Sequence, residues 1–214
     1  MSRTIKLDSV TKSYKGTMVL NNVTESFFGG HIYGIIGRNG SGKTMLFKAI
    51  CGFVKLDSGH VKIDGKIIGK DVDFPSNAGI MIEIETPGFT GYLSGSQNLK
   101  NLAAIRRKIG EDEIKGAMQK VGLDYYSKKK VRQYSLGMKQ RLGIAQAIME
   151  DPDILILDEP TNALDTEAIE DFHKILLDEK EKGKIILLAS HNKEDIDILC
   201  DKVFVMENGV LIKK

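Results

Sequence analysis

The sequence contains no long apolar run, and that absence restricts what the chain can do alone. Its apolar segments, for example Ile154–Leu157 and Ile185–Ala189, are far shorter than the roughly 20 residues that a membrane-spanning helix needs. The chain therefore cannot form a channel itself, and any transport would require a membrane partner. Met1–Asp8 also lacks the continuous apolar stretch of a secretory signal, which predicts a cytoplasmic protein.

Cysteine is scarce as well. The two cysteines, Cys51 and Cys200, lie in apolar helical patterns without the spacing of metal ligands, so we expect buried, reduced thiols instead of a disulfide or a metal site. The net charge of +2 points to no particular partner. The basic run Lys128–Lys130 lacks interleaved aromatic residues. A solvated loop explains that run better than a nucleic-acid partner, and we expect no such partner.

What the sequence does contain is the pattern of a single α/β domain. Its 214 residues, 42% hydrophobic and 28% charged, suit one globular domain. Short β-branched segments alternate with helical patterns, and continuous apolar strands are typical of a parallel sheet covered by helices on both faces. The strand and helix pairs are Ile32–Ile36 with Thr44–Cys51, Ile154–Leu157 with Thr166–Leu177, and Ile185–Ala189 with Glu194–Leu199.

Other segments predict an antiparallel β layer beside that core. Its candidate strands are Ile5–Val10, Val19–Phe27 and Val61–Ile67. Asp64-Gly65 is a plausible hairpin turn, and Asn208-Gly209 predicts a second hairpin between Val203–Met206 and Val210–Ile212.

The middle of the chain, from about Leu93 to Ala147, has no strand-like run and predicts a mostly helical subdomain. Ser94, with Gln97 three residues later, has the form of a capping box at a helix start. An apolar face at helical spacing follows, formed by Met138, Leu142, Ala145 and Met149. We therefore predict one domain over residues 1–214, with a core and antiparallel layer from 1–88 and 148–214 and a helical subdomain over 89–147.

A glycine-rich segment lies between the first core strand and the next helix. Gly37-Arg38-Asn39-Gly40-Ser41-Gly42-Lys43-Thr44 matches the phosphate-binding P-loop in the context that this motif requires. Its glycines let backbone N–H groups turn toward phosphate oxygens, and the helix start adds partial positive charge. Lys43 would reach the β- and γ-phosphates, and the Thr44 hydroxyl would bind Mg²⁺. A plain glycine-rich turn is the weaker explanation.

Two adjacent carboxylates end a second core strand. Asp158 and Glu159 follow Ile154–Leu157, where open α/β sheets place their ligand sites. Neighbouring carboxylates repel, so a cation is expected nearby. Asp158 suits the coordination of Mg²⁺, and Glu159 could accept a proton from the water that attacks the γ-phosphate. Without the P-loop, a surface turn before Pro160 would be the better explanation.

A third motif narrows the class from NTPase to one family. Tyr134-Ser135-Leu136-Gly137-Met138-Lys139-Gln140-Arg141 resembles the signature sequence of the ABC ATPase family, usually Leu-Ser-Gly-Gly-Gln followed by a Gln-Arg pair. The resemblance covers nearly the whole chain and keeps the family's order. Tyr14 resembles the aromatic residue that stacks on adenine, Asn162-Ala163-Leu164-Asp165 resembles the D-loop, and Ser190-His191 resembles the switch histidine.

The resemblance implies a P-loop NTPase fold and the ATP-hydrolysing subunit of a transporter, with ATP and Mg²⁺ as ligands. It implies catalytic roles for Glu159, His191, Lys43 and Asp158, and metal contacts for Thr44, Asp158 and Glu85. The implied ATP-binding residues are Tyr14, Gly37, Arg38, Asn39, Gly40, Ser41, Gly42, Lys43, Thr44, Ser135 and Gly137. Those implied at a dimer interface are Ser135, Leu136, Gly137 and Asp165.

In the family, the P-loop of one subunit and the signature of the other enclose each ATP. The resemblance therefore implies a homodimer, or a dimer with a paralogous ATPase, that drives a transmembrane permease on a separate chain from the inner face of the membrane. The variant motifs, including Ile84-Glu85-Thr86-Pro87, look most like those of the bacitracin and lantibiotic export branch.

The chain departs from the family pattern at several positions. Tyr134, Leu136 and Met138 replace leucine, glycine and glutamine of the signature. Glu85 stands where the family usually has a glutamine that contacts Mg²⁺, and we expect its carboxylate to keep the metal role. Glu83 is the competing assignment for that position.

Several of these residues also have plainer explanations. Tyr14 could be a half-buried tyrosine at a strand end, Asp165 could simply cap the helix that starts near Thr166, and His191 could be an ordinary histidine at a helix entry.

The segment from Pro87 to Leu102 contains Phe89, Tyr92 and Leu93, which would supply anchors for a membrane partner. Local packing of the helical subdomain is an equally good explanation for any one of them.

Two other functions compete. Asn192-Lys193-Glu194-Asp195 matches the guanine-specificity motif of regulatory GTPases, but no Asp in the chain is followed three positions later by Gly, which that class uses to sense the γ-phosphate. A soluble ABC-type ATPase in a non-transport complex is the nearer rival. Such proteins usually carry coiled coils, tandem cassettes or nucleic-acid-binding extensions, and the sequence shows none.

Overall fold

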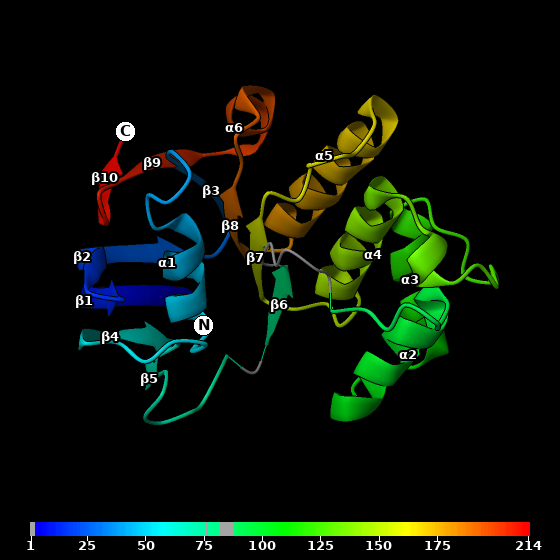
Figure 1. Ribbon diagram of the computed structural model, residues 1–214, viewed down its shortest axis with the longest axis horizontal. Helices are drawn as coiled ribbons and strands as arrows, with labels where there is room; N and C mark the ends of the chain where they lie inside the picture. The colour runs from blue at the N-terminus through cyan, green and yellow to red at the C-terminus, as the bar shows by residue number, and fades with distance from the viewer. Residues whose placement is uncertain (1–2, 76, 82–87) are drawn as a thin grey trace.

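The computed structural model describes residues 3–75, 77–81 and 88–214, which form two β-sheets and a group of helices (Figure 1). The antiparallel sheet lies at one side, a mostly parallel sheet lies in the middle, and most helices cover the far face of that central sheet. None of the helices in the described ranges has both the length and the apolar character needed to cross a membrane.

The central sheet has six strands in the order β10-β9-β3-β8-β7-β6. Their bounds are β3 (His31–Ile36), β6 (Ala78–Met81), β7 (Ile154–Asp158), β8 (Ile185–Ala189), β9 (Lys202–Glu207) and β10 (Val210–Lys213). All neighbours are parallel except β9 and β10. Every residue of β7 and β8 is buried, as continuous apolar strands covered on both faces require. The predicted α/β core is therefore confirmed.

The predicted hairpin at Asn208-Gly209 joins β9 to β10. Asn208 and Gly209 have φ angles of 48° and 79°. Two consecutive positive φ angles are typical of a type I′ turn, whose twist matches that of the flanking strands. Asp64-Gly65, with φ angles of 48° and 82°, makes the second predicted turn, between β4 and β5.

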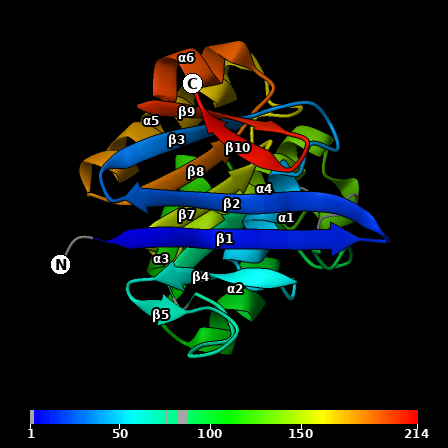
Figure 2. The ribbon, with the colours of Figure 1, turned by 90° about the vertical axis from the view of Figure 1, so that its left-hand side faces the viewer.

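The antiparallel sheet has the order β2-β1-β4-β5 and lies across the front of Figure 2. Its strands are β1 (Thr4–Tyr14), β2 (Thr17–Phe28), β4 (Ser58–Ile63) and β5 (Lys66–Ile67). Helix α1 (Lys43–Ile50) packs between the two sheets, because Leu46, Phe47 and Ile50 bury their side chains in one core with residues of both sheets. This core fixes the helix that the P-loop precedes.

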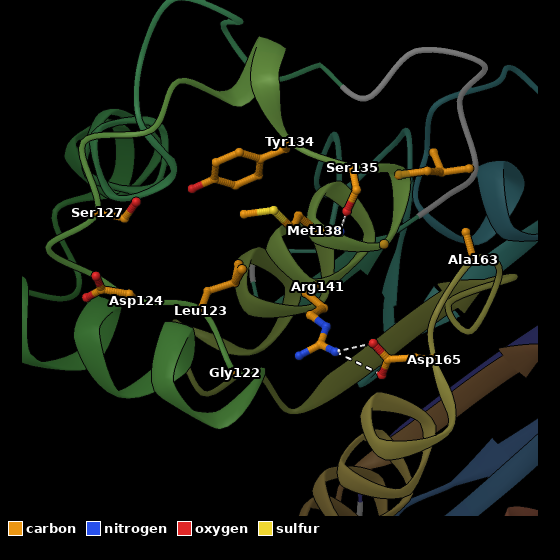
Figure 3. A pocket seen from close by; sticks show the side chains of 12 residues that line it. Gly122, Leu123, Asp124, Ser127, Tyr134, Ser135, Met138, Arg141, Ala163 and Asp165 are labelled. Atoms are coloured by element: carbon orange, nitrogen blue, oxygen red, sulfur yellow. Dashed lines mark hydrogen bonds and ion pairs between the residues drawn. The ribbon is translucent and has the colours of Figure 1, made fainter.

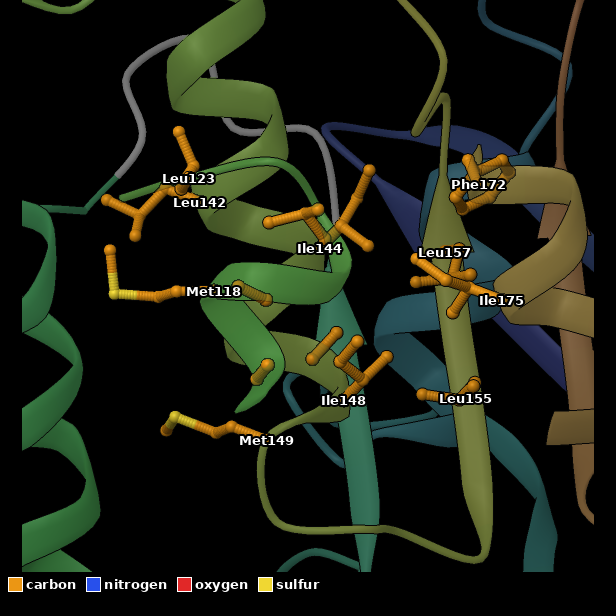
Figure 4. Close-up of a cluster of buried hydrophobic side chains, with 14 of the residues drawn as sticks. Met118, Leu123, Leu142, Ile144, Ile148, Met149, Leu155, Leu157, Phe172 and Ile175 are labelled. Carbon is orange, nitrogen blue, oxygen red and sulfur yellow. The ribbon is translucent and has the colours of Figure 1, made fainter. Parts of the chain in front are cut away.

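A second core covers the other face of the central sheet (Figure 4). Ile144 and Ile148 of helix α4 (Leu136–Ile148) face Leu155 and Leu157 of β7, with Phe172 beside them. The helices in the region are α2 (Gly95–Arg106), α3 (Glu111–Lys120), a 3₁₀ turn η1 (Val131–Gln133), α4 (Leu136–Ile148), α5 (Thr166–Glu181) and α6 (Lys193–Leu199). Each fully buried Leu or Ile stabilises the fold by roughly 1.5–3 kcal/mol.

Helix α2 begins where the sequence predicts. The Ser94 side chain accepts a hydrogen bond from the Gln97 N–H, and the Gln97 side chain accepts one from the Ser94 N–H, which completes the capping box. In α4, Leu142 and Ala145 are buried on the predicted apolar face, followed by Met149 at its end. Both sequence predictions are confirmed.

Candidate nucleotide-binding site

The P-loop residues lie between β3 and α1, at the carboxyl end of the central sheet. Gly37, Gly40 and Gly42 have φ angles of 154°, 78° and 114°, a region that favours glycine. A Cβ on Gly37 would lie 2.4 Å from the Met206 carbonyl oxygen, and one on Gly42 would lie 2.5 Å from that of Val19. The two glycines therefore allow the loop to pack against β9 and β2.

Two polar groups of the loop, the Lys43 ammonium and the Ser41 hydroxyl, are buried. Lys43 is buried, and its Nζ donates a hydrogen bond to the Gly37 carbonyl oxygen at 2.8 Å. The hydroxyl oxygen of Ser41 is buried, and within the described ranges it has no hydrogen-bond partner. A buried hydroxyl without a partner is costly, so the loop is built to receive polar atoms from a ligand.

Thr44 and Asp158 meet directly. The Thr44 Oγ1 donates a hydrogen bond of 2.6 Å to Asp158 Oδ2, although 114 residues separate them in the sequence. Asp158 ends β7 and is 2% exposed. One hydroxyl and one carboxylate are suitable oxygen ligands for Mg²⁺, which takes few protein ligands and completes its shell with phosphate oxygens and water. The described residues contain no cluster of three or more His, Cys, Asp or Glu side chains that could hold a metal.

Glu159 and His191 form a second pair next to this site. The Glu159 side chain is 6% exposed, and its Oε1 lies 3.2 Å from His191 Nε2. Its Oε2 accepts a hydrogen bond from the His191 backbone N–H at 3.1 Å. His191 Nε2 also lies 2.8 Å from the Oδ1 of Asn39, so the histidine bridges the P-loop and the carboxylate.

The electrostatic environment of Glu159 suits a proton acceptor. Burial raises the pKa of its carboxyl group, and the neighbouring Asp158 raises it further, whereas the His191 N–H, the His191 ring and Lys43 lower it. The net direction is upward from the ordinary value of 4.5. A carboxylate whose pKa is raised binds a proton more strongly, which favours general-base chemistry.

Gln140, for which the sequence predicts no partner, also contacts this site. Its Nε2 donates a hydrogen bond of 2.7 Å to the Glu159 carbonyl oxygen, so helix α4 touches the turn that carries the carboxylate. Glu159 itself has a φ of 50°, which is uncommon for a residue with a side chain. In the sequence, Gln140 stands out only as part of the Gln-Arg pair after the signature. That pair does not indicate which residue Gln140 contacts.

The signature residues line a separate pocket with the D-loop (Figure 3). Ser135 caps α4 by accepting a hydrogen bond from the Met138 N–H. Gly137 lies against the D-loop, since a Cβ there would be 2.7 Å from the Ala163 carbonyl oxygen. Leu136, which replaces a glycine of the family pattern, is 62% exposed.

Arg141 joins α4 to the D-loop. Its Nη2 contacts both carboxylate oxygens of Asp165, at 2.9 and 3.0 Å, as Figure 3 shows. Asp165 also accepts a hydrogen bond from the Ala168 N–H and so caps α5, as its plainer explanation predicts. These hydrogen bonds and Arg141 lower the pKa of the Asp165 carboxyl group.

The remaining predicted residues fall into three groups. Tyr14 ends β1 and is 56% exposed, which fits both a tyrosine at a strand end and a ring that a ligand can reach. Phe89 packs against the second core, which supports local packing, whereas Tyr92 is 71% exposed. Glu83 and Glu85, with the rest of Ile84-Glu85-Thr86-Pro87, lie outside the described residues.

The guanine-specificity motif does not form a base-binding site. Asn192 caps α6, and Asp195 is fully buried with its carboxylate hydrogen-bonded to Thr161, His173 and Ser190. A carboxylate whose oxygens are already bonded inside the protein cannot select a guanine base. The structure therefore argues against the GTPase alternative.

Residues 20–162 match the family model described as "ABC transporter". An ABC transporter ATP-binding protein of Bacillus subtilis is 44% identical over 97% of this chain and 94% of its own length. This chain belongs to the ABC transporter family. A lantibiotic transport ATP-binding protein of Streptococcus pyogenes is 35% identical over 98% of the chain and 90% of its own length, and a bacitracin transport ATP-binding protein of Enterococcus faecalis is 38% identical over 100% and 70%.

Solved structures confirm the fold of an ABC ATPase cassette. A dimeric ATP-binding cassette in a post-hydrolysis state, bound to ADP and Pi, superimposes with a TM-score of 0.85 over 98% of this chain and 97% of its own, at 22% identity. The predicted P-loop NTPase fold with an antiparallel β layer is therefore confirmed.

Proposed function

We propose that the chain binds ATP with Mg²⁺, hydrolyses it, and thereby powers a separate transmembrane permease of the type that exports peptide antibiotics. One observation carries the proposal: a buried carboxylate with a raised pKa, Glu159, lies against His191, which in turn contacts Asn39 of the P-loop. Phosphates of a nucleotide held by that loop would therefore lie next to both Glu159, the proton acceptor, and His191.

The residues take the following roles in this proposal. The N–H groups of the P-loop, with Lys43 and Ser41, hold the phosphates, and Tyr14 offers its exposed ring to the adenine base. Thr44 and Asp158 would hold Mg²⁺, which when bound neutralises charge on the phosphate oxygens. We retain Glu85 as a further metal contact, with Glu83 as its rival.

Glu159 accepts the proton of the water whose oxygen attacks the γ-phosphorus, and the bond to the ADP oxygen breaks as the new bond forms. His191, held by Asn39 and Glu159, donates a hydrogen bond to the γ-phosphate or orients the attacking water. Glu159 follows β7 and His191 follows β8, so both lie at the carboxyl end of the central sheet, beside Asn39 of the P-loop.

Dimerisation belongs to the same proposal. Ser135, Leu136, Gly137 and Asp165 line or flank one pocket, and within the described ranges that pocket has no P-loop residue in its lining. A second copy, or a paralogous ATPase, would complete each nucleotide site with this surface. Hydrolysis would then release the two subunits and move the permease from the inner face of the membrane. The division into one domain with a helical subdomain over 89–147 remains part of the proposal.

The decisive experiment compares the wild type with Glu159→Gln. We expect phosphate release to fall by about 10²- to 10⁴-fold, which is the usual contribution of a general base. The affinity for ATP should stay within about twofold, since the amide keeps the shape of the carboxylate, and size-exclusion chromatography should show an ATP-dependent dimer. Glu167→Gln, an exposed acid in the first turn of α5, is the matched control.

Two outcomes would contradict the proposal. Normal turnover of Glu159→Gln would remove the carboxylate from the base role, and a strictly monomeric protein with ATP and Mg²⁺ at saturation would remove the shared site. Purification from detergent would distinguish the transporter from the rival function, a soluble ATPase in a non-transport complex. A polytopic membrane protein bound to the chain supports a transporter, and a complex without one supports a non-transport ATPase.

A further inference from the structure

A buried polar cluster joins the two loops that carry Glu159 and His191. Its centre is Asp195 of α6, whose side chain is fully buried. Asp195 Oδ2 accepts hydrogen bonds from Thr161 Oγ1 at 2.6 Å and Ser190 Oγ at 2.8 Å. Its Oδ1 lies 2.8 Å from His173 Nε2 and accepts a longer bond from Asn192 Nδ2 at 3.4 Å. Thr161, His173 and Ser190 are themselves buried.

The two hydroxyls on Oδ2 belong to the two loops that carry the hydrolytic residues. Thr161 follows Glu159 by two positions, and Ser190 immediately precedes His191. The Ser190 oxygen also accepts a hydrogen bond from the Asn192 N–H at 3.0 Å, so this hydroxyl is held on both sides. One carboxylate oxygen therefore ties the loop after β7 to the loop after β8.

The loop after β7 needs such a tether. Glu159 has a left-handed φ of 50°, and a conformation of this kind persists only where surrounding contacts enforce it. On one side, the Glu159 N–H donates to the Ala189 carbonyl oxygen at 2.8 Å. On the other side, the Thr161 hydroxyl is anchored to Asp195. Together with the Gln140 hydrogen bond to the Glu159 carbonyl oxygen, these contacts hold the turn that carries the Glu159 carboxylate.

A charged acceptor is well suited to this position. Hydrogen bonds to an ionised group are about twice as strong as those between neutral groups. Each hydroxyl that donates to Asp195 has its rotation fixed, which leaves the Ser190 lone pairs free to accept the Asn192 N–H. Asparagine would retain the shape but would lose the charge and replace one acceptor oxygen with an NH₂ donor, which must face either the two hydroxyls or the side of His173 and Asn192.

Building on the proposed ATP hydrolysis, we propose that Asp195 is a positioning residue that holds Glu159 and His191 in their relative geometry through Thr161 and Ser190. His173 supports it from α5, the helix that begins directly after Asp165. The cluster therefore connects the two loops that carry Glu159 and His191 to α5.

The test uses Asp195→Asn in the full chain, with Asp197→Asn as the matched control on the exposed side of the same helix. Amide hydrogen exchange measured by NMR reports positioning without nucleotide, because the His191 N–H donates to Glu159 and the Asn192 N–H to Ser190. Loss of a buried, charge-assisted hydrogen bond predicts about a tenfold or greater rise in exchange at both amides. Turnover should fall by about tenfold or more, and the affinity for ATP should stay within about twofold.

The variants Thr161→Val and Ser190→Ala each remove one hydroxyl that donates to Asp195, and should show smaller changes in amide exchange and turnover in the same direction. They test the positioning role if Asp195→Asn does not fold. Unchanged exchange and turnover would overturn the inference. A rise in exchange spread equally over β3, β7 and β8 would also overturn it, because it would indicate a general loss of stability. If the wild type does not hydrolyse ATP, the proposed function fails, and the exchange pattern alone then supports or overturns the positioning role.

Discussion

The buried ion pair between Glu179 and Lys184 gives the sharpest prediction about the stability of this cassette. Both side chains are 3% exposed, and they are in direct contact, with Glu179 in the last turn of α5 and Lys184 directly before β8. Lys182 Nζ also contacts Glu179 Oε1 at 2.6 Å. Glu179→Gln leaves the Lys184 ammonium buried with its main partner gone, and removing one member of a buried pair typically costs about 3–5 kcal/mol.

Because the exposed Asp151 still pairs with Lys184, we expect the lower end, about 3 kcal/mol. For a chain of this length, a loss of that size lowers Tm by roughly 6–12 °C. The control is Asp171→Asn on the same helix, whose partner Lys174 is 71% exposed. An exposed pair of this kind contributes at most about 1 kcal/mol.

The assay is urea unfolding of three variants: Glu179→Gln, Lys184→Met, and the double variant that carries both substitutions. The double variant should be less destabilised than the sum of the singles, since it leaves no uncompensated charge at the centre of the pair. The idea is wrong if Glu179→Gln loses no more stability than Asp171→Asn, or if the two single losses simply add.

The same pair predicts a pH dependence. Burial by itself raises the pKa of Glu179, but its hydrogen bonds and charge interactions with Lys182 and Lys184 outweigh burial and hold the pKa below the ordinary 4.5. A lowered pKa in the folded state means that the carboxylate stabilises the fold fully above pH 4.5. The advantage of the wild type over Glu179→Gln should therefore shrink as the pH falls below that value and disappear below the lowered pKa.

Three further results are expected. Thr44→Val removes the hydroxyl that contacts Asp158 and should raise the Mg²⁺ concentration for half-maximal ATP hydrolysis by about tenfold; an unchanged Mg²⁺ titration would exclude Thr44 from the metal site. Gly79→Ala places a Cβ 1.8 Å from the Ala147 carbonyl oxygen and should cost about 1–3 kcal/mol in urea unfolding, whereas Gly116→Ala in α3, where nothing lies within 4 Å, should be neutral or stabilise by up to about 1 kcal/mol. Burial raises the pKa of Cys51 and Cys200 to about 12, so neither thiol should react with an alkylating reagent at about pH 8 until the chain unfolds; rapid labelling of the folded protein would contradict this.

Local patterns in the sequence accounted for much of the fold because their causes are local. Ser94 and Gln97 are three residues apart, so their capping box needs no other element. Asn208-Gly209 adopts the positive φ angles of its turn for the same reason. Strand β6 (Ala78–Met81), in contrast, was not predicted, because it is short and contains a glycine. It exists through its parallel pairing with β7 and the close approach of Gly79 to α4.

The candidate site divides in the same way. The residue types and their spacing predicted the P-loop, Asp158 and Glu159, since phosphate binding and proton transfer demand particular groups at particular strand ends, and the family resemblance added His191. Only the tertiary structure brought Asn39 to His191, Gln140 to the Glu159 carbonyl, and Thr161, His173 and Ser190 to one buried carboxylate. Such contacts join segments far apart in the chain, and the strand order of the central sheet decides which segments meet. A sequence pattern records the chemistry of each residue, whereas the partner of each residue depends on how the elements pack.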